Sequence, residues 1–238
     1  MSKILVLART GFGKSTSIGK IPELNLVGLN PEETFIISAT SKPLPFRKSG
    51  EFYKIVEKGQ PPTKENGNRF VTNIGEEVAK VISYILENRK EIKNIVIDDM
   101  NYIMQDMYMQ QALKTGFDVF KKIGKSMDEV FSAMEKSSTV NFICLAHFEE
   151  YKDTSDDTVS YRFKTVGKMV QDYITPEGKF DVVLYGRQSI GEDKKVLKQF
   201  VTNFDGQYPS KSPVGMFTEM YIPNDLGLVV EMVNSYYN

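Results

Sequence analysis

Residues 8–15, with the sequence ARTGFGKS, constrain the fold of this 238-residue chain more than any other feature. The segment follows a short apolar run at residues 4–7, and the residues from Lys14 to Gly19 can begin a helix that Pro22 ends early. A glycine-containing turn between a buried strand and a helix is the context that a phosphate-binding loop requires, because glycine lets the backbone approach an anion closely. The segment therefore predicts a strand, a phosphate-binding loop and a helix in that order.

The loop contains the groups that a nucleoside triphosphate needs. A polyanion is held by backbone N–H groups, a helix N-terminus and a fixed cation. We predict that Lys14 reaches the β and γ phosphates of ATP and acts in catalysis, and that the Ser15 hydroxyl is a ligand of Mg²⁺. Ala8 replaces the first glycine of the usual pattern. The residues expected to contact the nucleotide are Arg9, Thr10, Gly11, Phe12, Gly13, Lys14, Ser15 and Thr16.

Two carboxylates, Asp98 and Asp99, follow a second apolar run at residues 95–97. Ligands of open α/β sheets bind at the carboxyl ends of the strands, so this pair is expected beside the phosphate loop. Asp98 is predicted to hold the Mg²⁺ shell. Asp99 is a candidate catalytic residue that polarises the attacking water, but adjacent acids also serve as plain caps, so both interpretations stay open.

His147, the only histidine, comes directly after the apolar run at residues 141–146. An imidazole can donate to an anionic oxygen, so His147 is a candidate catalytic residue that senses the γ-phosphate or orients water. The alternative is a capped or core histidine. Glu149 is either a second candidate base or, together with Glu150, part of a solvated face.

Two further segments contain basic residues, one together with a glycine and the other together with aromatic residues. Residues 162–168 (RFKTVGK) include Lys164 and Lys168, candidate catalytic cations that would stabilise charge on a phosphoryl group bound to a neighbouring subunit. The alternative is a solvated basic face. Aromatic and basic residues between 46 and 70 could clamp single-stranded nucleic acid, although such mixtures are ordinary in loops. They are Phe46, Arg47, Lys48, Phe52, Tyr53, Lys54, Arg69 and Phe70.

Apolar runs and helical periodicities alternate along the chain, which predicts an α/β fold with a mainly parallel, doubly wound sheet flanked by helices. Candidate caps are Asn73 with Glu76 for one helix and Asn224 for the last. We expect a single domain over 1–238, with a core over about 1–205 and a C-terminal extension and helix over about 206–238. Strands are expected at 4–7, 35–39, 95–97, 141–146, 180–185 and 196–202, and helices at 74–86, 120–134 and 226–237.

Composition limits the possible partners and the compartment. The 30 basic and 31 acidic residues nearly cancel, which argues against a strongly basic surface for nucleic acid over the whole molecule and leaves room for a local basic groove. Cys144 stands alone and cannot form an internal disulfide, as expected for a reduced intracellular protein. Since no apolar run approaches the roughly 18 residues of a membrane span, we expect a cytoplasmic protein without a membrane partner.

The order of these motifs along the chain resembles that of the short RecA-like P-loop ATPases of bacteriophages. Members of that family are linked to single-strand annealing and recombination. The resemblance spans most of the chain and rests on residues 8–15, 41–46 (SKPLPF), 97–99, 146–147, 164–168, 180–185 and 222–226 (IPNDL). It implies a RecA-like core, ATP and Mg²⁺ bound near subunit interfaces, and single-stranded DNA as ligand. It also implies a homo-oligomeric ring or filament, a single-strand-binding protein as a further partner, and action in the host cytoplasm.

One departure from the RecA-like pattern concerns the catalytic base. A glutamate commonly follows the second strand in RecA-like proteins, whereas residues 38–46 contain none and Glu51 is the first acid after that strand. Asp99, Glu51 and Glu149 therefore stay open as bases, and slow hydrolysis is conceivable.

The expected function is that of an ATPase that binds single-stranded DNA and promotes annealing or strand exchange. One alternative is another phage DNA motor: a helicase, a helicase loader or a packaging ATPase. A nucleotide kinase is disfavoured because the arginines are few and scattered. A GTP switch is disfavoured because the Asn-Lys-x-Asp motif is absent from the sequence.

Overall fold

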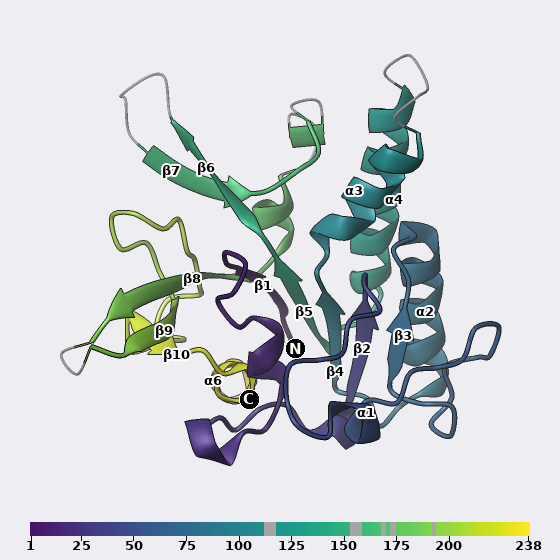
Figure 1. The fold of residues 1–238 in the computed structure, drawn as a ribbon, viewed down its shortest axis with the longest axis horizontal. Helices are drawn as coiled ribbons and strands as arrows, with labels where there is room; N and C mark the ends of the chain where they lie inside the picture. Colours follow the sequence, from purple (N-terminus) through teal and green to yellow (C-terminus); the bar gives the residue numbers. More distant parts are fainter. Residues whose placement is uncertain (112–117, 153–158, 168–169, 172–174, 192–193) are drawn as a thin grey trace.

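An eight-stranded sheet forms the centre of the molecule (Figure 1). The computed structural model describes residues 1–111, 118–152, 159–167, 170–171, 175–191 and 194–238. The strand order is β10-β9-β8-β1-β5-β4-β2-β3, and all strands from β8 to β3 run parallel, whereas β9 is antiparallel to both of its neighbours. The bounds are β1 (Lys3–Leu7), β2 (Thr34–Ser38), β3 (Arg69–Val71), β4 (Asn94–Asp98), β5 (Asn141–Ala146), β8 (Val182–Ile190), β9 (Val196–Val201) and β10 (Tyr221–Pro223).

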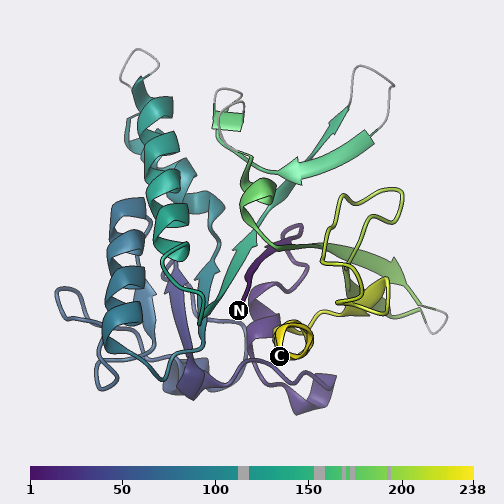
Figure 2. The same ribbon diagram turned by 180° about the vertical axis from the view of Figure 1, so that it is seen from behind.

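Both faces of this sheet are covered, so the predicted α/β architecture with a mainly parallel sheet is confirmed. Leu5 and Leu7 of β1 pack with α2 (Gly75–Asn88), α3 (Asn101–Gln110) and α4 (Asp118–Met134) on one face. Ile4 and Val6 point to the other face, where α6 (Leu226–Tyr237) lies beside the short 3₁₀ helix η1 (Ser15–Ile18) (Figures 1 and 2). This burial on both faces explains why the central strands read as continuous apolar runs.

The remaining short elements connect the strands. They are the 3₁₀ helices η2 (Pro22–Leu24), η3 (Pro31–Glu33) and η4 (Pro176–Lys179), and the single-turn helix α1 (Ser49–Phe52). In both views α1 lies beyond the amino ends of the strands, on the side of the sheet away from the β6–β7 hairpin (Figures 1 and 2).

The two predicted helix caps are wrong. The amide of Asn73 donates to Asp106 Oδ2 at 2.6 Å, and no side chain caps α2. At α6 the cap is Asp225, whose Oδ1 accepts from Gly227 N–H at 2.8 Å. Asp225 also accepts from the backbone of Val27 and Gly28, so a tertiary contact decides which of two adjacent polar residues becomes the cap.

A separate antiparallel hairpin, β6 (Phe148–Lys152) and β7 (Val159–Phe163), projects beyond the carboxyl end of β5 (Figure 1). Neither strand was predicted from sequence. The hairpin returns the chain to the sheet, where Lys164 N–H donates to His147 O at 2.9 Å. Two segments 17 residues apart in sequence thus meet at the edge that carries the phosphate loop.

Within the described ranges, none of the helices is both long and apolar enough to cross a lipid bilayer.

Candidate functional site

The predicted phosphate loop leaves β1 at its carboxyl end and turns sharply at its two glycines. Gly11 and Gly13 have φ angles of +80° and +101°, a region that favours glycine because it has no Cβ. Across the described part of the chain, the amides of residues 13–16 donate to no backbone or side-chain acceptor. Successive free N–H groups at a positive-φ turn make an anion-binding concavity.

The predicted short helix after the loop extends over only one turn. It is the single 3₁₀ turn η1, and Gly19 ends it in an extended conformation (ψ 144°). A Cβ on Gly19 would lie 2.5 Å from the Phe46 ring, so the chain turns away through a gap that only glycine fits. A helix macrodipole therefore contributes little here, and the free amides and a lysine are left to bind the anion.

Lys14 is buried at the base of the loop, with 6% of its surface exposed. Its ammonium Nζ donates to Ala8 O at 3.2 Å and lies 3.3 Å from His147 Nδ1. Burial lowers the pKa of Lys14, whereas the Asp99 and Asp98 carboxylates act in the opposite direction. A phosphate oxygen at this position would give the ammonium an anionic partner, because Ala8 O is only a neutral carbonyl.

Ser15 and Asp98 meet, as the sequence predicted. Ser15 Oγ donates to Asp98 Oδ1 at 2.8 Å, although the strands β1 and β4 are separated by β5. Burial and, to a lesser extent, the adjacent Asp99 raise the pKa of Asp98 to about 6, although the hydrogen bond from Ser15 and the nearby Lys14 and Arg69 act in the opposite direction. A buried carboxylate without a full cationic partner is electrostatically unfavourable, so the site is suited to a metal ion.

Asp99 and His147 form the other side of the site. Asp99 has a left-handed backbone (φ +61°), which aspartate tolerates better than most residues, and its Oδ1 lies 3.7 Å from His147 Nε2. Burial and the Lys14 ammonium lower the pKa of His147, so the imidazole is neutral at pH 7. His147 Nδ1 lies 3.3 Å from Lys14 Nζ and 3.1 Å from Ala8 O. With the proton on Nε2, Nδ1 accepts from Lys14 and Nε2–H faces the Asp99 carboxylate, whereas with the proton on Nδ1 the imidazole donates to Ala8 O.

Asn101 is a site residue that sequence reasoning missed. Its side chain is buried, accepts from His147 N–H at 2.5 Å and donates to Lys164 O at 2.6 Å. It therefore joins the start of α3, the end of β5 and the end of β7. The only sequence signal was its position three residues after Asp98, which does not reveal the two distant segments that it connects.

Two side chains from the last quarter of the chain contact the loop, and they too were missed. Lys198 Nζ donates to Gly11 O at 3.0 Å, and Asn224 Nδ2 donates to Gly13 O at 3.1 Å. Both contacts join residues almost the whole chain apart, so local patterns give no signal for them.

The two other candidate bases, Glu149 and Glu51, each pair with a basic side chain other than Lys14. Glu149 Oε1 accepts from Arg162 Nε at 2.9 Å, and Glu150 Oε2 lies 3.4 Å from Arg9 Nη2. Glu51 is on α1, away from the carboxyl ends of the strands, and its exposed carboxylate lies 3.9 Å from Lys48 Nζ. Asp99 is the candidate base that the fold brings beside Lys14.

Of the two candidate catalytic cations in the basic segment 162–168, the structure describes only Lys164. Lys164 has an exposed side chain, and its backbone is fixed beside His147 of the same chain. Its charge contributes to lowering the pKa of His147, which places it near the chain's own site. Lys168 lies outside the described residues.

Two of the eight residues of the predicted aromatic and basic clamp are buried and do not reach the surface. Tyr53 and Arg69 are 1% and 4% exposed. The Arg69 guanidinium donates to Ser38 Oγ at 2.9 Å and to Lys42 O at 2.6 Å, so it ties β3 to the segment after β2. These two side chains therefore cannot contact a base, because a base can stack only on an accessible ring. The exposed members of the set are Arg47, Lys48, Phe52 and Lys54.

A magnesium ion fits the donor set near the loop. Mg²⁺ prefers oxygen ligands and usually keeps one or two carboxylates together with phosphate oxygens and water. Ser15 Oγ and Asp98 Oδ1, 2.8 Å apart, are oxygens of the required kind. In the described part of the chain, no group of three or more histidine, cysteine, aspartate or glutamate side chains could enclose a metal by itself, so the remaining ligands would come from phosphate and water.

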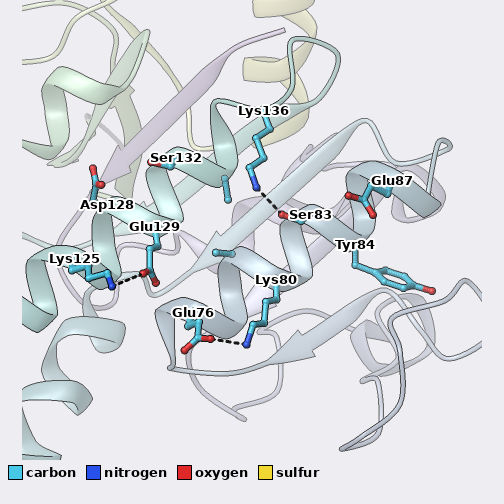
Figure 3. A pocket seen from close by; sticks show the side chains of 12 residues that line it. Glu76, Lys80, Ser83, Tyr84, Glu87, Lys125, Asp128, Glu129, Ser132 and Lys136 are labelled. Atoms are coloured by element: carbon cyan, nitrogen blue, oxygen red, sulfur yellow. Dashed lines mark hydrogen bonds and ion pairs between the residues drawn. The ribbon is translucent and has the colours of Figure 1, made fainter.

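The helical face carries a groove of about 750 Å³ between α2 and α4 (Figure 3). Two helix-surface ion pairs line it, Lys80 with Glu76 at 2.6 Å and Lys125 with Glu129 at 3.7 Å. None of its lining residues belongs to the loop or to the strand ends that carry Asp98 and His147. We assign it no chemistry.

No protein-family model and no curated protein matches the chain. Among solved structures, the flagellar accessory protein FlaH from Methanocaldococcus jannaschii is similar over 87% of this chain and 79% of that chain, with 10% sequence identity and a TM-score of 0.43. A likeness at this level is too weak to assign a fold family or a function.

Proposed function

We propose that this chain is a RecA-like ATPase that binds ATP and Mg²⁺ at residues 8–16 and hydrolyses the γ-phosphate. The observation that carries the proposal is the 2.8 Å hydrogen bond between Ser15 Oγ and Asp98 Oδ1. Two residues 83 positions apart meet at one point beside the free amides of the loop. Such a meeting is expected if both are ligands of one cation and is unnecessary for a strand-to-helix turn alone.

Each residue of the site would have a separate role. The amides of residues 13–16 would bind phosphate oxygens, and the Lys14 ammonium would neutralise charge on the β and γ phosphates. Ser15 and Asp98 would hold Mg²⁺, which when bound neutralises charge on the phosphates. Asp99 would accept a proton from the attacking water. The neutral His147, with Nε2–H toward Asp99, would keep that carboxylate oriented.

Single-stranded DNA is the proposed ligand, and annealing or strand exchange is the proposed process. Support for both comes from the sequence resemblance to the phage ATPases. The same resemblance supports a homo-oligomer, a single-strand-binding protein as partner, a host-cytoplasmic location, and a role for Lys164 and Lys168 in the site of a neighbouring subunit.

The test is ATP hydrolysis by the purified chain, measured with and without single-stranded DNA, while particle size is followed in the same samples. We expect Mg²⁺-dependent hydrolysis that rises with DNA, accompanied by particles larger than one chain. Hydrolysis that is absent in every condition would reject the ATPase. Hydrolysis with no response to DNA, together with transfer of phosphate to a nucleotide, would favour a kinase instead.

A further inference from the structure

Two side chains from the C-terminal part of the chain hold the phosphate loop by its carbonyl oxygens. Lys198 on β9 reaches Gly11 O at 3.0 Å, and Asn224, directly after β10, reaches Gly13 O at 3.1 Å. The two are neighbours in the sheet, because Asn224 N–H continues the β9–β10 pairing and donates to Lys198 O at 3.3 Å. The outermost strands of the sheet therefore present two donors to the loop.

Holding a carbonyl oxygen fixes the amide on the other side of the same peptide plane. In a trans peptide the C=O and the N–H point in opposite directions. Gly13 O is directed to Asn224 and to Ser17 N–H at 3.1 Å, so the N–H of Lys14 points away from them. That N–H is one of the amides that donate to no acceptor in the described residues. Gly13 needs this restraint, because its φ of +101° belongs to a region that glycine leaves easily.

Asn224 is positioned for this contact at an energetic cost. Its residue surface is 8% exposed, and its Oδ1 is buried with no hydrogen-bond partner in the described part of the chain. A buried acceptor without a partner destabilises a fold. The contact of Nδ2 with Gly13 O gives a reason for an amide at this position.

The segment that carries Asn224 is itself rigidly attached. The next residue, Asp225, caps α6 and accepts from the backbone of Val27 and Gly28. A Cβ on Gly227 would lie 2.2 Å from Gly28 O, so α6 begins in direct contact with the chain that leaves η1. Loop, η1 and α6 thus form one packed unit (Figure 1).

We propose that Asn224 and Lys198 are positioning residues of the phosphate site. Asn224 holds Gly13 O so that the N–H of Lys14 stays directed at the phosphates. Lys198 holds the Gly11–Phe12 peptide, whose N–H donates to Arg9 O at 3.3 Å, and so fixes the turn that precedes the free amides. The inference rests on the proposed nucleotide binding. It assigns the C-terminal extension a part in binding the triphosphate group and no contact with the nucleoside.

The test measures the affinity of the full chain for a fluorescent ATP analogue with Mg²⁺ and, by competition, for inorganic tripolyphosphate. We expect Asn224→Ala to bind both ligands roughly tenfold more weakly, the upper range for one neutral hydrogen bond. Asn88→Ala is the control, because Asn88 Nδ2 also donates to a backbone carbonyl, Tyr84 O at 2.9 Å, at the end of α2. The control should bind both ligands as the wild type does.

Lys198 allows a second test that does not depend on a buried substitution, since its bond to Gly11 lies at the surface. Lys198→Met and Lys198→Gln both remove the charge, but glutamine keeps an N–H donor. We expect the glutamine variant to bind tripolyphosphate several-fold more tightly than the methionine variant. Equal affinities would show that only the charge of Lys198 acts, and they would overturn its positioning role.

Other outcomes separate this inference from the proposed function. If the wild type binds neither ligand, the nucleotide site itself is rejected. If the wild type binds and Lys14→Ala does not, while Asn224→Ala binds both ligands within twofold of wild type, the positioning role alone is wrong. A loss for the ATP analogue without a loss for tripolyphosphate would overturn it as well, because Asn224 would then contact the nucleoside. If Asn224→Ala does not fold, the comparison of Lys198→Met with Lys198→Gln tests the positioning role.

Discussion

Lys14 carries the largest single contribution to the proposed binding of phosphate. Its ammonium is buried and lies close to two carboxylates, so no water can replace its charge at a bound triphosphate. We expect Lys14→Ala to reduce ATP turnover by at least about a hundredfold and to leave the far-ultraviolet circular dichroism spectrum unchanged. Lys80→Ala, on the exposed surface of α2, is the control. Normal turnover in a folded Lys14→Ala protein would reject the assignment of the loop.

The two adjacent aspartates should separate in their effects. Asp98 contacts Ser15, whereas Asp99 faces His147, so the first is placed for the metal and the second for water. Asparagine also tolerates the left-handed backbone of residue 99, so Asp99→Asn should fold normally. We expect it to lower turnover roughly a hundredfold with little change in Mg²⁺-nucleotide affinity. Asp98→Asn should chiefly weaken that affinity.

Steady-state turnover and equilibrium binding of a nucleotide analogue, measured on the same preparations, distinguish the two roles. Turnover that survives Asp99→Asn would move the base to Glu149 or Glu51. Of these, Glu149 lies on β6, two residues after His147.

At the scale of elements, the side chain of Asn101 connects the start of α3, the end of β5 and the end of β7. Asn101→Ala would leave His147 N–H and Lys164 O without their side-chain partner. Each unpaired group costs about 1–3 kcal/mol, so we expect a loss of roughly 2–4 kcal/mol in the free energy of unfolding, measured with urea. Asn88→Ala is the control. Asn88 donates to Tyr84 O at an exposed helix end, and the loss there should stay within about 0.5 kcal/mol. Equal losses in the two variants would contradict the connecting role.

How far the sequence predicts each element depends on how local its cause is. The strand–loop segment at 4–15 and the carboxylates after residue 97 were predictable, because apolar runs and glycines act within a few residues. The helix α3 was missed because its residues, NYIMQDMYMQ, carry no clear apolar stripe. The β6–β7 hairpin was missed because β6 is only five residues long and has a single buried residue, Phe148, followed by half-buried and exposed ones.

The contacts of Asn101, Lys198 and Asn224 could not be predicted at all, since each joins segments that only the folded sheet brings together. The cap of α6 shows the same limit on a smaller scale. Asn224 and Asp225 are equally good caps by residue type, and packing against residues 27 and 28 selects the second.

At the scale of the whole molecule, the near balance of charge leaves the proposed DNA binding dependent on a local surface. A groove that neutralises phosphates releases counterions, so the affinity for single-stranded DNA should fall steeply as salt rises, whereas duplex DNA should bind less well throughout. Fluorescence anisotropy of a labelled oligonucleotide from low to physiological salt, with ATP and Mg²⁺ present, measures this. An affinity that does not change with salt would contradict a phosphate-binding groove, and no binding at low salt would remove DNA from the proposal.

The stability of the whole molecule should report the charge of one buried residue. Burial raises the pKa of Asp98 from 3.8 to about 6, so the folded state binds its proton more tightly than the unfolded state does. The stability that this proton contributes is fully present below the unfolded pKa and is lost as pH rises through about 6. A shift of about two pKa units corresponds to roughly 3 kcal/mol, an upper value because neighbouring charges rearrange.

Asp98→Asn removes this titration and keeps an oxygen that can accept from Ser15 Oγ. With a chelator present to exclude metal ions, the variant should match the wild type near pH 4 and exceed its free energy of unfolding by up to about 3 kcal/mol above pH 7. Urea unfolding across this range gives the difference, in which the other carboxylates cancel. Asp118→Asn, a change of the same kind at an exposed residue at the start of α4, is the control variant. A difference in free energy of unfolding that is constant with pH, or that grows toward low pH, would mean that the folded protein does not destabilise the Asp98 carboxylate.

A gain in stability that accompanies the loss of Mg²⁺-nucleotide binding is the pattern expected of a residue that serves the site and not the fold.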